Sequence, residues 1–119
     1  MNLAEQPTSY LAAVMTLYVQ LPETPMRISL ADQAMARRLF KDGVPLETVE
    51  AALLLGSVRR LIRPKDAPTL SPIRSLAYFQ PIIEELIEHP APKSYLDCLR
   101  LKLQQAAKAV SANVQKIRS

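Results

Sequence analysis

Residues 44–60 have the sequence VPLETVEAALLLGSVRR, and this stretch decides the fold class. Its apolar positions Leu46, Val49 and Leu53 recur at spacings of three and four, which is the spacing of one face of an α-helix. The run of three leucines in the middle places apolar side chains on more than one side of that helix, so we expect it to be the central helix of the fold. Because glycine disfavours a helix interior, we expect Gly56 to mark a close packing contact or a bend.

Proline and glycine usage extends the helical prediction to the rest of the chain. Ten prolines divide the 119 residues into apolar segments, most of them long enough for three or more helical turns, whereas two glycines provide little material for β-hairpin turns. Only residues 26–30 alternate as a short strand would, and they equally fit a loop that enters a helix. We therefore predict an all-α protein in which residues 1–119 form one compact bundle of about five helices.

Two helices are expected before the central one. The first, Tyr10–Leu21, contains no charged residue, so it is either a core helix or a docking surface for a partner, and the core interpretation is favoured. The second opens with Ser29 and Asp32 at the spacing of a capping box and stops at Asp42 and Gly43. Three cations share its outer face: Arg37, Arg38 and Lys41.

Two further helical segments are expected after the central helix. Residues 73–79 form the first, and Pro81 either kinks it or starts a second helix that ends at His89. Acidic residues fall on the solvent side of this second helix, where we interpret them as a solvated face: Glu84, Glu85 and Glu88.

The last helix is predicted to be long and amphipathic, over residues 94–117, with Ser94 and Asp97 at capping-box spacing. Its apolar positions alternate steps of three and four through Leu96, Leu99, Leu103, Ala106, Val110, Asn113 and Ile117. The stripe would place the basic segment 93–119 on the bundle or leave it extending from the bundle. It could also pair two copies of the chain, with Asn113 setting the register.

Positive charge gathers in two parts of the chain, whose net charge is +4. One is the end of the central helix and the loop after it, and the other is the last helix, on the side opposite its apolar stripe. We interpret both as surfaces for the phosphates of nucleic acid, DNA rather than RNA; the alternatives are ordinary solubilising side chains and stabilisation of a helix dipole. The candidate contact residues are Arg59, Arg60, Arg63, Lys65, Arg74, Arg100, Lys102, Lys108, Lys116 and Arg118.

Few residues of the chain suit catalysis. His89 stands at a predicted helix end, where its ring suits the dipole, and Cys98 is expected to be a small core residue. The sequence shows no glycine-rich phosphate loop, no metal-ligand pair and no Ser/His/Asp set. We therefore predict no cofactor, no metal and no enzymatic activity. The single cysteine excludes an intramolecular disulfide, and no stretch is apolar enough to span a bilayer, which together favour the cytoplasm and no membrane partner.

Two segments resemble a known class of proteins. Residues 49–61, VEAALLLGSVRRL, and 71–86, SPIRSLAYFQPIIEEL, resemble segments of helical proteins encoded with bacterial mobile elements and associated with plasmid-type replication initiation. Related replication proteins carry an Ile-x-x-x-x-Tyr segment after a helix pair, which Ile73 and Tyr78 resemble. The resemblance implies a DNA transaction such as replication and carries over no catalytic residue. The chain departs from the class in lacking a wing and a recognition helix, since Glu47 and Glu50 would face the bases.

These observations predict a nucleic-acid-binding accessory protein that contacts mainly phosphates. The alternative is a protein interaction module or a small helical subunit of a larger bacterial complex. Such a module would dock, or form a homo-oligomer, through Tyr10–Leu21 or through the heptads of the last helix.

Overall fold

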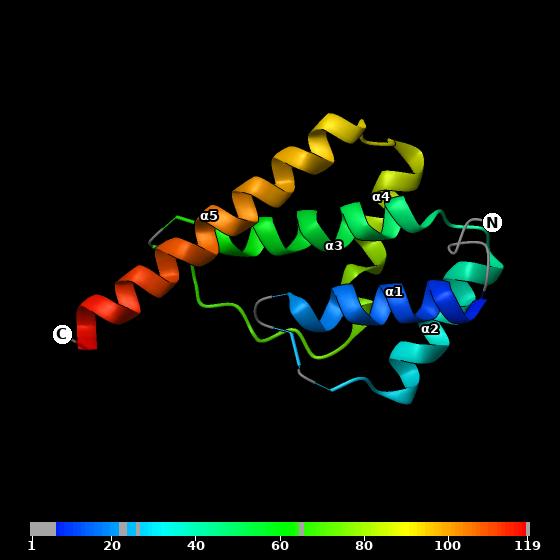
Figure 1. Ribbon diagram of the computed structural model, residues 1–119, viewed down its shortest axis with the longest axis horizontal. Helices are drawn as coiled ribbons and strands as arrows, with labels where there is room; N and C mark the ends of the chain where they lie inside the picture. Colours follow the sequence, from blue (N-terminus) through cyan, green and yellow to red (C-terminus); the bar gives the residue numbers. More distant parts are fainter. Residues whose placement is uncertain (1–6, 22–23, 26, 65, 119) are drawn as a thin grey trace.

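The computed structural model describes residues 7–21, 24–25, 27–64 and 66–118, with side chains for all of these except 7 and 106–118. Within these residues the protein is all-α, with five α-helices, one 3-10 turn and no strand (Figure 1). The elements in chain order are α1 (Pro7–Gln20), α2 (Leu30–Lys41), α3 (Leu46–Leu61), the 3-10 turn η2 (Leu76–Phe79), α4 (Gln80–Glu88) and α5 (Lys93–Arg118). The predicted all-α fold class is confirmed. Of the two alternatives left open for residues 26–30, the described residues 27–30 take the loop that enters a helix.

Helix α3 is the centre of the bundle, as its sequence predicts. It contacts α1, η2, α4 and α5, so residues 51–58 are buried on every side (Figure 1). The predicted close contact at Gly56 is also present: a methyl group built on its Cα would lie 2.7 Å from Cε1 of Phe79. Glycine at this position therefore lets η2 approach the backbone of α3.

Helix α1 is a core helix. Tyr10, Val14 and Tyr18 are each no more than 2% exposed, and they face α2, α3 and η2. The Tyr10 hydroxyl donates a 2.8 Å hydrogen bond to the carbonyl O of Val44, which ties the start of α1 to the turn between α2 and α3. The side chains that α1 leaves fully exposed are small or polar, and Leu11, Leu17 and Val19 are partly buried against the core.

The predicted capping box opens α2 and has a further role. Asp32 N donates to Ser29 Oγ and Ser29 N donates to Asp32 Oδ2, both at 3.0 Å. The second oxygen of the same carboxylate, Oδ1, accepts a 2.9 Å hydrogen bond from Leu76 N, and Asp32 is only 2% exposed. A capping residue of α2 thus also anchors the start of η2. The helix ends at Lys41 with Asp42 as its C-cap, and Gly43 takes the positive φ of 77° that the turn requires.

The predicted helix over residues 73–79 is wrong for its first half. Residues 71–75 are irregular, and only Leu76–Phe79 form the single 3-10 turn η2. The reason is tertiary: the carbonyl of Ser71 accepts from Arg60 and the N–H of Leu76 donates to Asp32, so these backbone groups have partners outside a local helix. Pro81 lies in the first turn of α4 and starts a new helix, which was one of the two alternatives.

Helix α5 packs along α3 through the first part of the predicted stripe. Leu96 and Leu99 are buried and Leu103 is half-buried. The side chains from Lys93 to Gln105 are described, and the amphipathic prediction is supported only over these thirteen residues, which are too few to bear out a long amphipathic helix. The rest of the stripe lies outside the described side chains: Ala106, Val110, Asn113 and Ile117. The helix begins at Lys93, so Ser94 lies in its first turn and not at the cap position that the sequence suggested.

Candidate nucleic-acid interface

Arg59, Arg60 and Arg63, at the end of α3 and just after it, have three different environments. Arg60 is buried, with 7% of its surface exposed. Its Nη2 donates a 2.7 Å hydrogen bond to the carbonyl O of Ser71, and its guanidinium carbon lies 5.2 Å from the centre of the Tyr78 ring. A guanidinium over an aromatic ring is stabilised by the negative face of that ring. Arg60 therefore holds the segment after α3 in place, and the structure does not bring it to the surface where a phosphate would bind.

Arg59 is exposed, but a carboxylate already matches its charge. Its Nη1 and Nη2 donate to Oε2 and Oε1 of Glu85 at 3.0 and 2.7 Å, in a bidentate ion pair between α3 and α4. This hydrogen bonding lowers the pKa of Glu85 below its ordinary value and raises the pKa of Arg59. Both side chains are about half exposed, so water screens the pair and a phosphate could compete with Glu85 only at the expense of this contact.

The remaining cations of this cluster are Arg63, Lys65 and Arg74. Arg63 Nη1 donates a 2.7 Å hydrogen bond to the carbonyl O of Pro68 and so folds the loop back onto the end of α3. Lys65 lies outside the described residues. Arg74 is exposed, and within the described part of the chain its side chain has no hydrogen bond or ion pair. The cluster is therefore not one continuous cationic surface.

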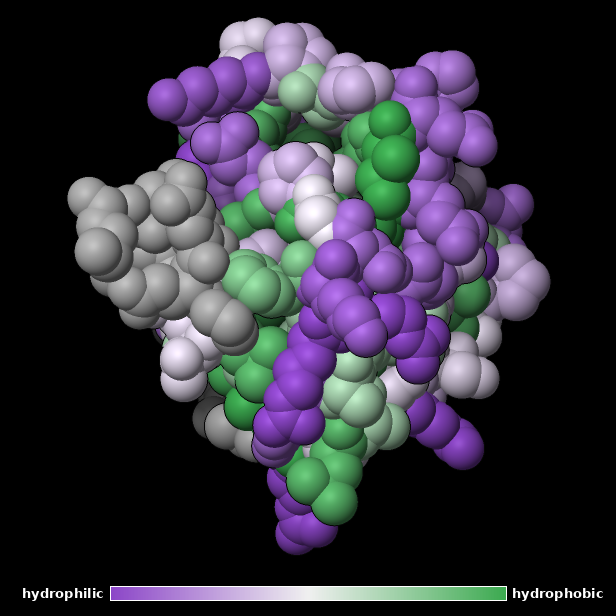
Figure 2. Space-filling view, turned by 90° about the vertical axis from the view of Figure 1, so that its right-hand side faces the viewer, coloured by the Kyte–Doolittle hydropathy of each residue, from purple (hydrophilic) through white to green (hydrophobic). Residues whose placement is uncertain are grey.

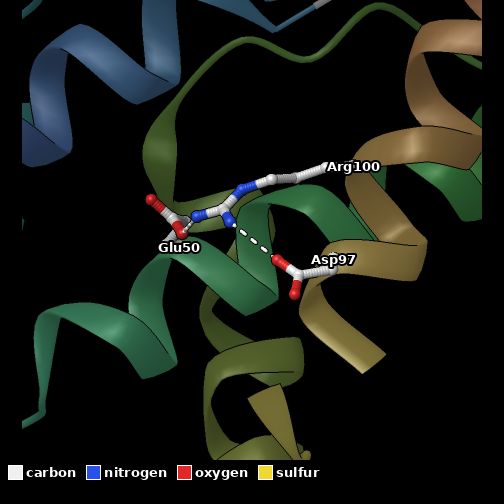
Figure 3. A network of polar contacts seen from close by, with 3 residues as sticks. All are labelled: Glu50, Asp97 and Arg100. Atoms are coloured by element: carbon white, nitrogen blue, oxygen red, sulfur yellow. Dashed lines mark hydrogen bonds and ion pairs between the residues drawn. The ribbon is translucent and has the colours of Figure 1, made fainter. Parts of the chain in front are cut away.

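Two of the predicted contact residues on α5 have described side chains: Arg100 forms ion pairs, and Lys102 forms none with a described residue. Arg100 extends toward α3, where Nη2 bonds Oε1 of Glu50, and its Nη1 bonds Oδ1 of Asp97 at 3.2 Å (Figure 3). Lys102 is exposed and has no partner among the described residues. The side chains of the other predicted cations lie outside the described part: Lys108, Lys116 and Arg118.

A third group of cations, on α2, is exposed and forms no ion pair with described residues, unlike Arg59 and Arg100 of the two predicted clusters. Arg37, Arg38 and Lys41 are all exposed on α2, and none of the three has a hydrogen bond or ion pair to another described residue. Their shared face is visible in the sequence as spacings of three and four. They are not among the contact residues predicted from the sequence, because the carboxylates and carbonyls that occupy the arginines of the other two clusters cannot be read from local spacing.

A cavity of about 300 Å³ lies where the start of α3, the end of α4 and the start of α5 meet. Ala51, Leu86 and Leu96 contribute apolar lining, and Glu50 and Arg100, which bond each other, contribute charged lining. Glu47 and Lys93 also line the cavity, so its two acids and two bases balance and it favours neither an anionic nor a cationic ligand.

The two residues with the most reactive side chains lie on the surface. His89 is exposed directly after α4, at the helix end where the sequence places it. Cys98 is exposed on α5, so its prediction as a core residue is wrong. It lies between the buried Leu96 and Leu99 in the sequence but faces solvent. Among the described residues, no three His, Cys, Asp or Glu side chains are grouped closely enough to hold a metal ion.

Comparison with protein-family models, with curated proteins and with solved structures finds no match to this chain. In the part of the chain that the structure describes, none of the helices has the length and apolar character needed to cross a bilayer.

Proposed function

We propose that this protein binds nucleic acid, DNA rather than RNA, through the phosphates, as an accessory protein in a DNA transaction such as replication or the movement of a mobile element. It acts as a binding protein and not as an enzyme. The observation that supports the proposal is that internal ion pairs leave an excess of exposed positive charge. In the described part of the chain, these pairs use only Arg59 and Arg100, while other exposed cations such as Arg74 and Lys102 have no partner.

The physical basis of the proposal is counterion release. Nucleic acid holds a layer of condensed cations, and a protein cation that replaces one of them gains the entropy of its release. Such contacts position a protein on the phosphate backbone and carry no sequence information. The binding surface therefore needs exposed, unpaired cations and does not need a recognition helix, which agrees with the acidic residues Glu47 and Glu50 near the start of α3.

The test is a titration of a fluorescent 24-base-pair duplex by anisotropy at several salt concentrations between about 50 and 200 mM. We expect log K to fall linearly with log salt, by about 0.9 for each phosphate contact, and two duplexes of unrelated sequence to bind alike. Arg74→Glu with Lys102→Glu should weaken binding and flatten the salt dependence. Affinity that does not respond to salt would exclude the proposal.

Arg60→Met is the matched control for these variants, because it removes a cation that is buried. It should leave the salt dependence of binding unchanged while lowering the thermal stability, since the bond to Ser71 and the contact with Tyr78 are lost. Arg60→Met lowers the net charge by one and the Arg74→Glu, Lys102→Glu variant lowers it by four. A change in the salt dependence about one quarter as large as that of the double variant would therefore show that net charge alone, and not exposed cations, sets the affinity.

Docking of a protein partner through α5 is the second candidate. Leu101 is 55% exposed and Tyr95 is 39% exposed on α5, on the sides that do not pack on α3. Exposed apolar side chains on one helix favour contact with another protein or with a second copy of this chain. Light scattering over a range of concentrations separates the candidates: a monomer at all concentrations argues against self-association through α5.

A further inference from the structure

We propose that the exposed face of α2, formed by Arg37, Arg38 and Lys41, is a phosphate-contacting surface and the principal one among the described residues. The proposal rests on the proposed function and names the surface that carries it. These three residues are called the basic face of α2 below.

The first argument is that no carboxylate of a described residue is bonded to the basic face of α2; the nearest acid in the sequence is the exposed Asp42, directly after Lys41. The four buried residues of α2 lie on the opposite side of the helix: Asp32, Met35, Ala36 and Leu39. Asp32 is the only acid within α2, and its carboxylate is buried and occupied by Ser29 N and Leu76 N. In contrast, the exposed arginines of α3 and α5 are bonded to carboxylates of neighbouring helices. A polyanion can therefore bind the basic face of α2 without breaking an ion pair between described residues.

The second argument is spacing. Arg37 and Lys41 are separated by four residues, which is a rise of about 6 Å along a helix axis. Successive phosphates of one strand of duplex DNA advance by about 3.4 Å along its axis. Three cations within this rise can thus approach two or three successive phosphates of one strand. The small exposed residue Ala34 lies one turn before Arg38, so no bulky side chain there keeps the strand from the helix.

The location of the basic face of α2 leaves it accessible. Helix α2 lies at the edge of the bundle and leads into the turn before α3 (Figure 1). The end of the molecule that contains this turn carries a continuous band of hydrophilic side chains (Figure 2). The main contacts of α2 among the described residues are with α1 and η2, and its buried residues lie on one side, so Arg37, Arg38 and Lys41 on the opposite side are exposed to a ligand.

Arg38 and Lys41 also lie in the last turn of α2, where cations stabilise a helix through its dipole. This effect acts on stability alone and does not require a ligand. The experiment must therefore measure a quantity that helix stabilisation does not change, and the salt dependence of binding is such a quantity.

The experiment compares single variants in the same duplex titration: Arg37→Gln, Arg38→Gln, Lys41→Gln, and the control Lys93→Gln. Lys93 is also exposed and without a partner among the described residues, so the control removes the same charge from the start of α5. Each α2 variant should reduce the salt slope by about 0.9 and the affinity at 0.1 M salt by about eightfold, and Lys93→Gln should leave the slope unchanged. The triple α2 variant should bind several hundredfold more weakly, while the charge-preserving triple variant Arg37→Lys, Arg38→Lys, Lys41→Arg should retain binding.

The outcomes distinguish the inference from the proposed function. If the native chain binds duplex with a steep salt dependence and the three single variants leave it unchanged, the inference is overturned and the proposed function stands. If the native chain shows no salt-dependent binding, the proposed function fails and the inference fails with it. Equal affinity for polyglutamate and for duplex DNA would make an acidic protein the ligand and would also overturn the inference. The single variants remain informative even if the triple variant does not fold.

Discussion

At the scale of single residues, Gly56 has no room for a side chain. A Cβ there would lie 2.7 and 2.8 Å from Cε1 and Cδ1 of Phe79 and 2.8 Å from Cδ1 of Ile82. Overpacking of a core costs about 1–3 kcal/mol, and the better helix propensity of alanine offsets about 1 kcal/mol of that. We expect Gly56→Ala to lower the free energy of unfolding by about 1 kcal/mol, measured by urea denaturation.

A double-mutant cycle with Phe79→Leu shows whether the ring is the cause. The leucine side chain is smaller, so Gly56→Ala should cost clearly less in the Phe79→Leu background than in the native one. An equal cost in both backgrounds would mean that the loss arises elsewhere, for example at Ile82.

Arg59 and Arg60 show how far the candidate site could be predicted from the sequence. The two are consecutive cations at the end of a helix, and local patterning gives them the same role. In the structure one is exposed and bonded to Glu85, 26 residues away, and the other is buried and bonded to the carbonyl of Ser71. The sequence shows where charge is abundant, but the partners that occupy a guanidinium are chosen by tertiary packing.

At the scale of elements, three predictions from local signals hold, whereas the cap predicted at Ser94 does not, because α5 begins at Lys93. The capping box of α2, the turn at Gly43 and the start of α4 near Pro81 each depend on residues within a few positions, and all three are present. The segment 71–75 is different, because the carbonyl of Ser71 accepts from Arg60 of α3 and the N–H of Leu76, directly after the segment, donates to Asp32 of α2. Its apolar spacing resembles a helix, yet no local rule indicates that a distant carboxylate and guanidinium will take its hydrogen bonds.

Asp32 joins two elements, and its substitution tests that role. Its carboxylate accepts N–H groups on both oxygens, from Ser29 and from Leu76. An asparagine has one acceptor oxygen and places an NH₂ group opposite the other N–H, so one buried donor is left unpaired. We expect Asp32→Asn to cost about 1–3 kcal/mol of unfolding free energy. The control Asp42→Asn changes an exposed acid at the other end of α2 and should cost less than about 0.5 kcal/mol.

At the scale of the whole molecule, two buried tyrosines link stability to alkaline pH. Burial raises the pKa of Tyr10 to about 12, and burial together with the charge of Asp32 raises the pKa of Tyr18 to about 12. Both rings pack edge-on against phenylalanines, Tyr10 on Phe40 and Tyr18 on Phe79, so neither can ionise in place without bringing a charge into the core. The stability of the bundle core should therefore depend on pH through Tyr10 and Tyr18.

The direction of the pH effect follows from comparing the tyrosine pKa values in the folded and unfolded chains. Above about pH 10 the unfolded chain releases both phenolic protons, while the folded chain keeps them until about pH 12, so the unfolded state becomes relatively more stable as the pH rises through this range. We expect the urea midpoint to fall steadily from pH 10 to pH 11.5. Tyr18→Phe should remove part of this fall without a loss at pH 7, because the Tyr18 hydroxyl is buried and has no hydrogen bond among the described residues. Tyr10→Phe should also reduce the fall but cost about 0.5–1.5 kcal/mol at pH 7, because the bond to Val44 is lost. If Tyr18→Phe and the native chain lose stability equally between pH 10 and 11.5, the Tyr18 hydroxyl is not the group that senses the pH.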